Sequence, residues 1–305
     1  MGIIRVMHSF FDRLMFPSIG YLYVGAAATL WASAGLMGAV ASGIPASALA
    51  AVRALSGGIA LCLFIGPKAI RTLDFRSSWP AVLETSAYLA LFQWTFFTSV
   101  ALAGASMASI ASTAVAPLAA DGIGFFRRSI APSKQWLMSG MVSIIGLLLP
   151  VFNGTPAWGM ASAAIAGSSY AAYTIAAARL ERAAGTTSAG LTATAVAFAG
   201  ASIVLLPAVL PHLVSLISLR ALLIALYLGF ATTALAYALF VRSLRHLSPS
   251  RALNAAFVQP LAAMALARMV TGEQIDRFTV AALGIFGLSI LLRTSLPWQP
   301  AWKTE

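Results

Sequence analysis

The chain is organised as long apolar runs separated by short gaps that hold its charges, prolines and glycines. An apolar run of about 20 residues in helical conformation spans the hydrocarbon core of a bilayer. A transmembrane β-barrel would instead alternate apolar and polar positions, which these runs do not. The pattern therefore predicts an all-α polytopic membrane protein with ten transmembrane helices: 18–41, 47–66, 80–102, 105–126, 134–152, 157–178, 187–210, 219–241, 250–270 and 278–296.

Composition excludes the other broad classes of protein. Hydrophobic residues make up 60% of the 305 residues, charged residues 9%, and the mean hydropathy is +0.89. A soluble domain carries about 25% charged residues, and disordered or disulfide-rich chains are far less apolar. The net charge of +11 does not indicate nucleic acid, because the basic residues lie in gaps between spans. Cys62, the single cysteine, lies within an apolar run and is expected to be a small packing residue.

Two segments outside the regular pattern have specific predictions. The third and fourth spans meet at Ala103-Gly104, so they should form a tight helical hairpin. Residues 1–17 show no signal-peptide cleavage site. Their apolar residues recur at helical spacing, which favours a short helix in the membrane interface, with disorder as the alternative. We divide the remainder into five-helix repeats at 18–152 and 153–296 and a cytoplasmic tail at 297–305.

The basic residues also predict orientation, because Lys and Arg accumulate on the cytoplasmic side of a membrane. Alternate gaps contain only Arg220, Arg268 and Arg277. The intervening gaps and the two ends hold Arg5, Arg13, Lys68, Arg71, Arg76, Arg127, Arg128, Lys134, Arg179, Arg182, Arg242, Arg245, Arg251, Arg293 and Lys303. An even number of spans with both termini cytoplasmic satisfies this alternation.

An internal similarity relates the two halves. The segment 117–120, Pro-Leu-Ala-Ala, recurs at 260–263, an offset of 143 residues that also aligns Trp94 with Tyr237. Each copy lies in the fourth span of a five-span half, and five is odd, so the second half would enter the membrane in the opposite orientation. Inverted repeats of this kind are typical of secondary transporters, whose substrate sites lie near the midplane between the halves. They also occur in channels and flippases.

Several short segments resemble EamA-type members of the drug/metabolite transporter superfamily. They occur in family order from about residue 21 to 292: 30–33 (Leu-Trp-Ala-Ser), 52–55 (Val-Arg-Ala-Leu), 259–261 (Gln-Pro-Leu), 272–273 (Gly-Glu), and Gly284 with Gly287. The first half departs from the pattern, since Ser129-Ile130 stands where a Gly-Glu pair is expected. The resemblance implies export or exchange of small metabolites, including amino acids, and a structural role for Glu273.

Arg53 is the charged residue placed well inside a predicted span, about 9–12 Å from its outer end at 1.5 Å per residue. A charge there is costly, about 2.5–3.5 kcal/mol on insertion scales. It either anchors a substrate carboxylate or is structural, bonding helix-end carbonyls or snorkelling outward. Glu84 and Asp121 lie near cytoplasmic span ends, where each either carries a proton or pairs with a nearby arginine.

Polar and aromatic residues at comparable depths predict a cavity between the halves. Lipid-facing positions would not favour them, although hydrogen bonds between helices are the alternative for each Ser, Thr or Asn taken alone. With Arg53, the candidate substrate-binding residues are Trp31, Ser33, Gln93, Trp94, Thr98, Thr113, Tyr170, Tyr173, Tyr237, Asn254 and Gln259. Pro117 and Pro260 are candidate hinges, because proline removes a backbone donor and kinks helices, with ordinary packing kinks as the alternative.

The sequence contains no Walker loop, dinucleotide fingerprint, metal-ligand cluster or nucleophile constellation. We therefore expect no enzyme activity and no cofactor, and a bilayer and a small-molecule metabolite as the partners. The favoured reading is a secondary transporter in the bacterial inner (plasma) membrane that exports or exchanges an amino acid or related compound. A drug or nucleoside exporter, or a non-transporting protein such as a lipid scrambler, remains the alternative. The sequence does not indicate an oligomeric state.

Overall fold

The computed structural model describes residues 2–41, 43–71, 75–126, 134–184, 189–243, 246–247 and 255–294, and these contain helices and turns but no strand. This confirms the all-α class. The helices are α1 Gly2–Val40, α2 Ala46–Arg71, α3 Phe75–Phe126, α4 Lys134–Phe152, α5 Ala157–Ala184, α6 Ala189–Val209, η1 Leu210–His212, α7 Leu213–Leu216, α8 Leu219–Leu226, η2 Tyr227–Leu235, α9 Ala236–Ser243, α11 Val258–Val270 and α12 Arg277–Thr294.

Five helical stretches are long and apolar enough to cross a membrane. They are Ile19–Val40, Ala46–Gly66, Ser78–Phe126, Gly190–His212 and Leu219–Ser243; shorter apolar helices cover Trp136–Phe152, Val258–Val270 and Arg277–Leu292. Helical residues occur in all ten predicted ranges, with the ninth described from residue 255 onward. The chain is thus a multi-pass membrane protein, and a count of ten crossings stays a prediction.

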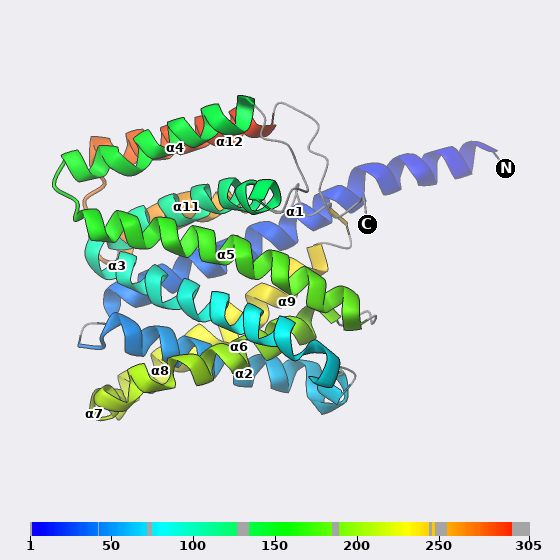
Figure 1. Cartoon of the computed structure of the whole chain (residues 1–305). Helices are drawn as coiled ribbons and strands as arrows, with labels where there is room; N and C mark the ends of the chain where they lie inside the picture. Colours follow the sequence, from blue (N-terminus) through cyan, green and yellow to red (C-terminus); the bar gives the residue numbers. More distant parts are fainter. Residues whose placement is uncertain are drawn as a thin grey trace.

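Gly104 divides α3 into two parts, as the predicted hairpin requires. Its φ of 83° and ψ of 161° lie outside the helical region, in a conformation that glycine adopts without steric cost. The stretch Ser78–Phe126 has 49 residues, more than twice the length of one crossing. Figure 1 shows the ribbon reversing at this end of α3, so the two parts run back through the bundle.

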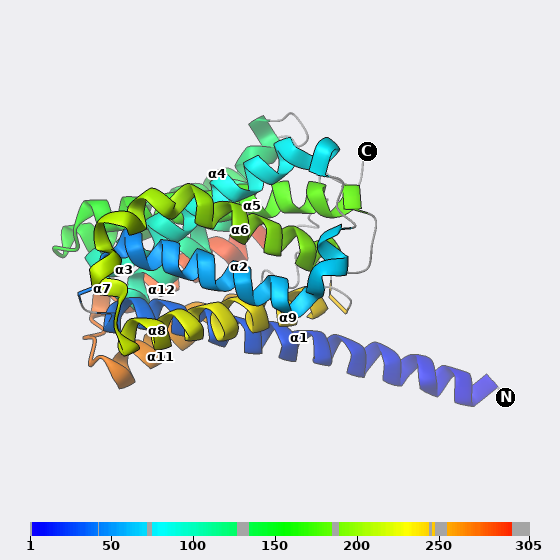
Figure 2. The same ribbon diagram turned by 90° about the horizontal axis from the view of Figure 1, so that it is seen from below.

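The N-terminal segment differs from the predicted boundary at residue 17. Helix α1 begins at Gly2 and continues without a break to Val40, 39 residues in all. Figures 1 and 2 show its N-terminal part extending beyond the rest of the bundle. Proline at position 17 does not end the helix, so the segment is helical and continuous with the candidate span Ile19–Val40; its placement in the membrane interface stays a prediction.

The bundle brings the two halves of the chain into contact along several helices. Helix α2 packs on α6 and η2, α4 packs on α12, α3 packs on α5, and α1 packs on α9 and α11. Figure 1 shows α4 and α12 side by side at one edge of the molecule, with α2 and α6 at the other. The core that positions the candidate site lies among α1, α2, α3, α6 and the segment η2–α9.

The two halves approach closely between α2 and η2, where glycines face the opposite helix. A Cβ placed on Gly229 would lie 2.7 Å from the backbone C and O atoms of Ser56, and one on Gly57 would lie 2.7 Å from Cγ2 of Thr233. Small residues allow helix backbones in a bilayer to approach this closely. Segment η2 is a π-helix, a wider turn that often marks functional sites.

Candidate functional site

Arg53 is buried at the α2–η2 contact, with 3% of its surface exposed. It lies eight residues into α2, so the predicted depth within the span is consistent with the helix observed. Its Nη1 donates to Oε1 of Gln93 at 3.0 Å, and its Nη2 donates to the carbonyl of Thr232 at 3.4 Å. The guanidinium also lies over the ring of Phe97, 5.9 Å from the centroid. Arg53 therefore connects α2 and α3 of the first half to η2 of the second.

Gln93 orients the arginine and keeps a donor of its own. It is fully buried, and its amide oxygen must face Arg53, because the guanidinium has no acceptor to receive an amide N–H. The amide Nε2 then points elsewhere, and it has no hydrogen-bond partner; neither does Nε of Arg53. The pair thus presents two buried N–H groups that no atom of the described residues accepts.

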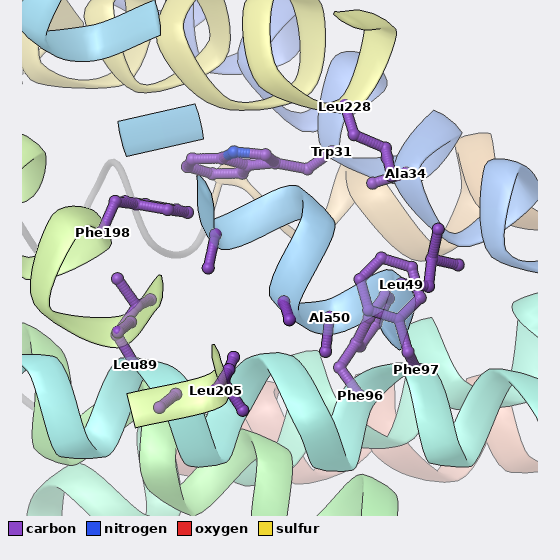
Figure 3. Close-up of a cluster of buried hydrophobic side chains, with 14 of the residues drawn as sticks. Trp31, Ala34, Leu49, Ala50, Leu89, Phe96, Phe97, Phe198, Leu205 and Leu228 are labelled. Carbon is purple, nitrogen blue, oxygen red and sulfur yellow. The ribbon is translucent and has the colours of Figure 1, made fainter. Parts of the chain in front are cut away.

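Aromatic rings surround this pair. Trp31 contacts Tyr237 edge-on and also packs on Phe240, with centroids 5.2 Å apart in each case. Tyr237 in turn meets Phe198 at 5.4 Å. Figure 3 shows Trp31 and Phe198 on one side of α2, with Phe96 and Phe97 on the other. Side chains from α1, α6 and α9 therefore form one aromatic cluster next to the arginine.

Tyrosines extend this cluster toward α5. Tyr170 packs on Phe92 at 5.1 Å and on Tyr173 at 5.9 Å. Tyr173 is buried, and its hydroxyl donates to Thr194 at 3.3 Å. Tyr170 and Tyr237 lie close enough to Arg53 to interact with its charge. The structure therefore brings together Trp31, Arg53, Gln93, Tyr170, Tyr173 and Tyr237 in one region.

Ser33 lies two residues after Trp31 on α1 and makes a different contact. Its hydroxyl is 2.8 Å from the hydroxyl of Tyr227, the first residue of η2, and donates to the carbonyl of Leu30 at 2.7 Å. It thus joins α1 to the second half by a hydrogen bond between helices.

Other predicted residues lie outside this region. Trp94 is half exposed on the outer side of α3, and Thr98 donates back to the Trp94 carbonyl at 2.8 Å. Thr113 and Gln259 are half-buried on α3 and α11. Asn254 lies outside the described residues. The structure does not bring Trp94 into the aromatic cluster. Gln93 lies on the buried face of α3, Trp94 on the exposed face, and Thr95 is half-buried.

The candidate hinges occupy unequal positions. Pro117 lies inside the second part of α3, whereas Pro260 is buried in the first turn of α11. Backbone N–H groups in a first helical turn have no helical partner, so a proline there breaks no hydrogen bond. Of these two prolines, Pro117 is therefore the one expected to kink its helix.

Glu273 and Asp276 stabilise the starts of two helical segments, the second part of α3 and α12. The Glu273 carboxylate accepts from the backbone N–H of Ser106 at 3.3 Å, directly after the break at Gly104. Asp276 precedes α12 and accepts from Thr279 through its backbone N–H and its hydroxyl, at 2.7 and 2.8 Å. Partial burial works to raise the pKa of Asp276, but these bonds outweigh it and the pKa is lowered. The role of Glu273 is thus a helix cap.

Sequence reasoning missed several of these groups. Phe97, Phe198 and Phe240 carry no polar signal, so a search for polar residues passed over them. The Thr232 carbonyl is a backbone group within the π-helix η2, so side-chain chemistry gave no signal for it. The contact of Ser139 and Ser143 with Ser289, at 2.8 and 2.7 Å between hydroxyls, joins α4 to α12. A serine repeated at a four-residue spacing was its one sequence signal.

Comparisons with known proteins agree with this architecture. Residues 157–295 match the EamA-like transporter family. The chain is 27% identical over 284 residues to the "Uncharacterized transporter YwfM" of Bacillus subtilis (strain 168), covering 90% of this chain and 94% of that protein. A solved structure described as "Crystal structure of protein" shares the fold, with a TM-score of 0.59 at 15% identity, over 90% of this chain and 95% of that one. The second half of the chain thus carries an EamA-like transporter domain, and the chain as a whole is similar to a protein named as a transporter.

Proposed function

We propose that the protein is a secondary transporter that exports or exchanges a small amphipathic metabolite, an amino acid or a related compound, by alternating access. The observation that carries this proposal is Arg53, a buried cation held between the halves by Gln93 and Thr232 with an N–H donor left over. A carboxylate is the natural partner of such a group, since charge-assisted bonds to guanidinium are the strong ones. The aromatic cluster suits the apolar part of the same molecule.

The helix contacts support two inverted five-helix repeats. If the second half repeats the first, α2 corresponds to α6 and α4 to α12, and each of these pairs is in contact. The contacts of α1 with α9 and α11 then correspond to those of α5 with the two parts of α3. A twofold relation between the halves predicts this reciprocal pairing.

Alternating access is supported by the burial of the site. Arg53 and Gln93 are almost fully buried, and neither lines the two hollows found between α2 and α6 and between α3 and α5. Both hollows open on outward-facing residues such as Leu63 and Ile165. A substrate therefore reaches Arg53 only if the helices move apart on one side of the membrane.

Counterflow in proteoliposomes tests this function. Vesicles loaded with an unlabelled mixture of amino acids and their derivatives should transiently accumulate a labelled member of the same mixture from outside. If the vesicles move fluorescent lipid between leaflets but exchange no amino acids, the protein is a scrambler. If vesicles loaded with nucleosides show counterflow and those loaded with amino acids do not, it is the alternative exporter. Reporters can be fused to the protein in the successive gaps between its predicted spans and expressed in bacterial cells. Their activities test the inner-membrane location, the ten crossings and the cytoplasmic termini.

A further inference from the structure

Three buried N–H donors of the candidate site are left unpaired. They are Nε of Arg53, Nε2 of Gln93 and Nε1 of Trp31, each without a hydrogen-bond partner among the described residues; the other unpaired buried groups are serine hydroxyls along α3. Their side chains are 3%, 0% and 8% exposed. A buried donor without an acceptor is costly, and three such donors within one aromatic cluster indicate a ligand that brings acceptors.

The site carries a positive charge that no buried negative side chain among the described residues balances. Arg53 is the one buried charged side chain in the part of the chain that the structure describes. Its recorded partners, an amide oxygen and a backbone carbonyl, are neutral. An isolated buried charge is unfavourable, so a ligand with one negative charge would neutralise the site, whereas a zwitterion would leave it positive.

From these observations we infer that the site selects monoanions, namely carboxylates that carry one apolar group and no free ammonium group. This inference rests on the proposed function and narrows its substrate class to amine-blocked or amine-free relatives of amino acids. The carboxylate would accept from Arg53 Nε and Gln93 Nε2. Trp31 would supply a ring surface and its indole N–H, which suits an additional acceptor such as an amide carbonyl.

The aromatic rings offer the main counter-argument, because they attract cations through their faces. Here that attraction is already used in part by Arg53, which lies over Phe97. A substrate ammonium close to the carboxylate would also lie near the guanidinium, and like charges in a low-dielectric region repel strongly. Tyr170 and Tyr237 offer neutral hydroxyls, which do not compensate a full positive charge.

A series of ligands with one side chain and three charges tests the inference on the full-length wild-type protein. At about pH 6, N-acetyl-L-phenylalanine is an anion, L-phenylalanine a zwitterion and L-phenylalaninamide a cation with its α-amino group protonated. Binding to the protein in detergent, by calorimetry, and counterflow in proteoliposomes should both rank the anion first, by about tenfold or more over the zwitterion, with the cation last. Equal or stronger binding of the zwitterion or the cation overturns the inference and leaves the proposed transport function intact.

Gln93→Glu provides a second readout. The new carboxylate would pair with Arg53 and remove the anion's partner, so affinity for N-acetyl-L-phenylalanine should fall about tenfold or more and the preference for anion over zwitterion should disappear. Cys62→Ser, on the same helix as Arg53, is the matched control and should keep the wild-type ranking. An unchanged preference in a folded Gln93→Glu protein overturns the inference. Absence of binding by all three ligands to wild type also overturns it, while counterflow of the wider mixture separately decides the transport function.

Discussion

Replacing Gly229 by alanine tests the close approach of α2 and η2. The added Cβ would lie 2.7 Å from the backbone C and O of Ser56, whereas carbon atoms are in optimal contact at about 3.5–4.0 Å. Backbone atoms cannot rotate away, so the helices must separate by about 1 Å. Overpacking of this kind costs about 1–3 kcal/mol. Because Arg53 precedes Ser56 by one turn, its bond to the Thr232 carbonyl would also lengthen and transport should fall.

Gly140→Ala in α4 is the matched control, because a Cβ there meets nothing within 4 Å. Gly140→Ala gains the α-helix preference of alanine over glycine, about 0.8–1 kcal/mol, and Gly229→Ala in the π-helix gains a comparable backbone term, so the larger part of their difference is steric. Unfolding in mixed micelles titrated with a denaturing detergent measures both free energies. We expect Gly229→Ala to be less stable than Gly140→Ala by about 1–3 kcal/mol. Equal stabilities would refute the packing of α2 on η2.

The other predictions concern Arg53, Glu273 and Asp276. Arg53→Leu unpairs the oxygen of Gln93, costing about 1–3 kcal/mol, but relieves a buried charge worth about 2.5–3.5 kcal/mol; detergent unfolding should therefore stay near wild type while counterflow is lost, and an unstable protein with normal counterflow would make Arg53 structural. Arg53→Lys should raise the half-saturation concentration in counterflow, because an ammonium lacks the planar fork; an unchanged value would argue against a bidentate carboxylate. Glu273→Gln should lower the unfolding free energy by about 0.3–1 kcal/mol, since the charge lies at a helix N-terminus, and no change would mean that the cap is not electrostatic. The lowered pKa of Asp276 means that its stabilisation is complete above its ordinary value of 3.8 and is lost as pH falls through the lower folded value; unfolding below about pH 4 should be less pH-dependent in Asp276→Asn, and an identical profile would contradict this.

The helices were predictable because apolar length and glycine position determine them strongly. The hairpin at Gly104 and the end of the second span at Gly66 follow from backbone conformations that only glycine adopts easily. The continuity of α1 was not predictable, because an amphipathic spacing does not distinguish a separate interfacial helix from the extension of a span. The π-helical form of η2, which packs against α2, has no local sequence pattern that would predict it.

The candidate site was predictable where chemistry was unusual for a span. Arg53 could be predicted because it is a charged residue within an apolar run. Gln93 and Trp31 could be predicted because polar and large aromatic residues are uncommon within such runs. Trp94 was grouped with them by its depth, yet the side of a helix that it occupies depends on which neighbours pack there. An inward or outward assignment needs the three-dimensional arrangement, because the apolar surface of a membrane protein faces both lipid and core.

The most direct test of the central claim is whether the region around Arg53 becomes accessible from both sides of the membrane. Thr232→Cys in a Cys62→Ser background places one thiol on the residue whose carbonyl accepts from Arg53. We would measure its alkylation by a membrane-impermeant maleimide added to the outside or the inside of proteoliposomes. We expect modification from each side, slowed from both by a transported carboxylate. Modification from one side alone, or from neither, would contradict alternating access at Arg53.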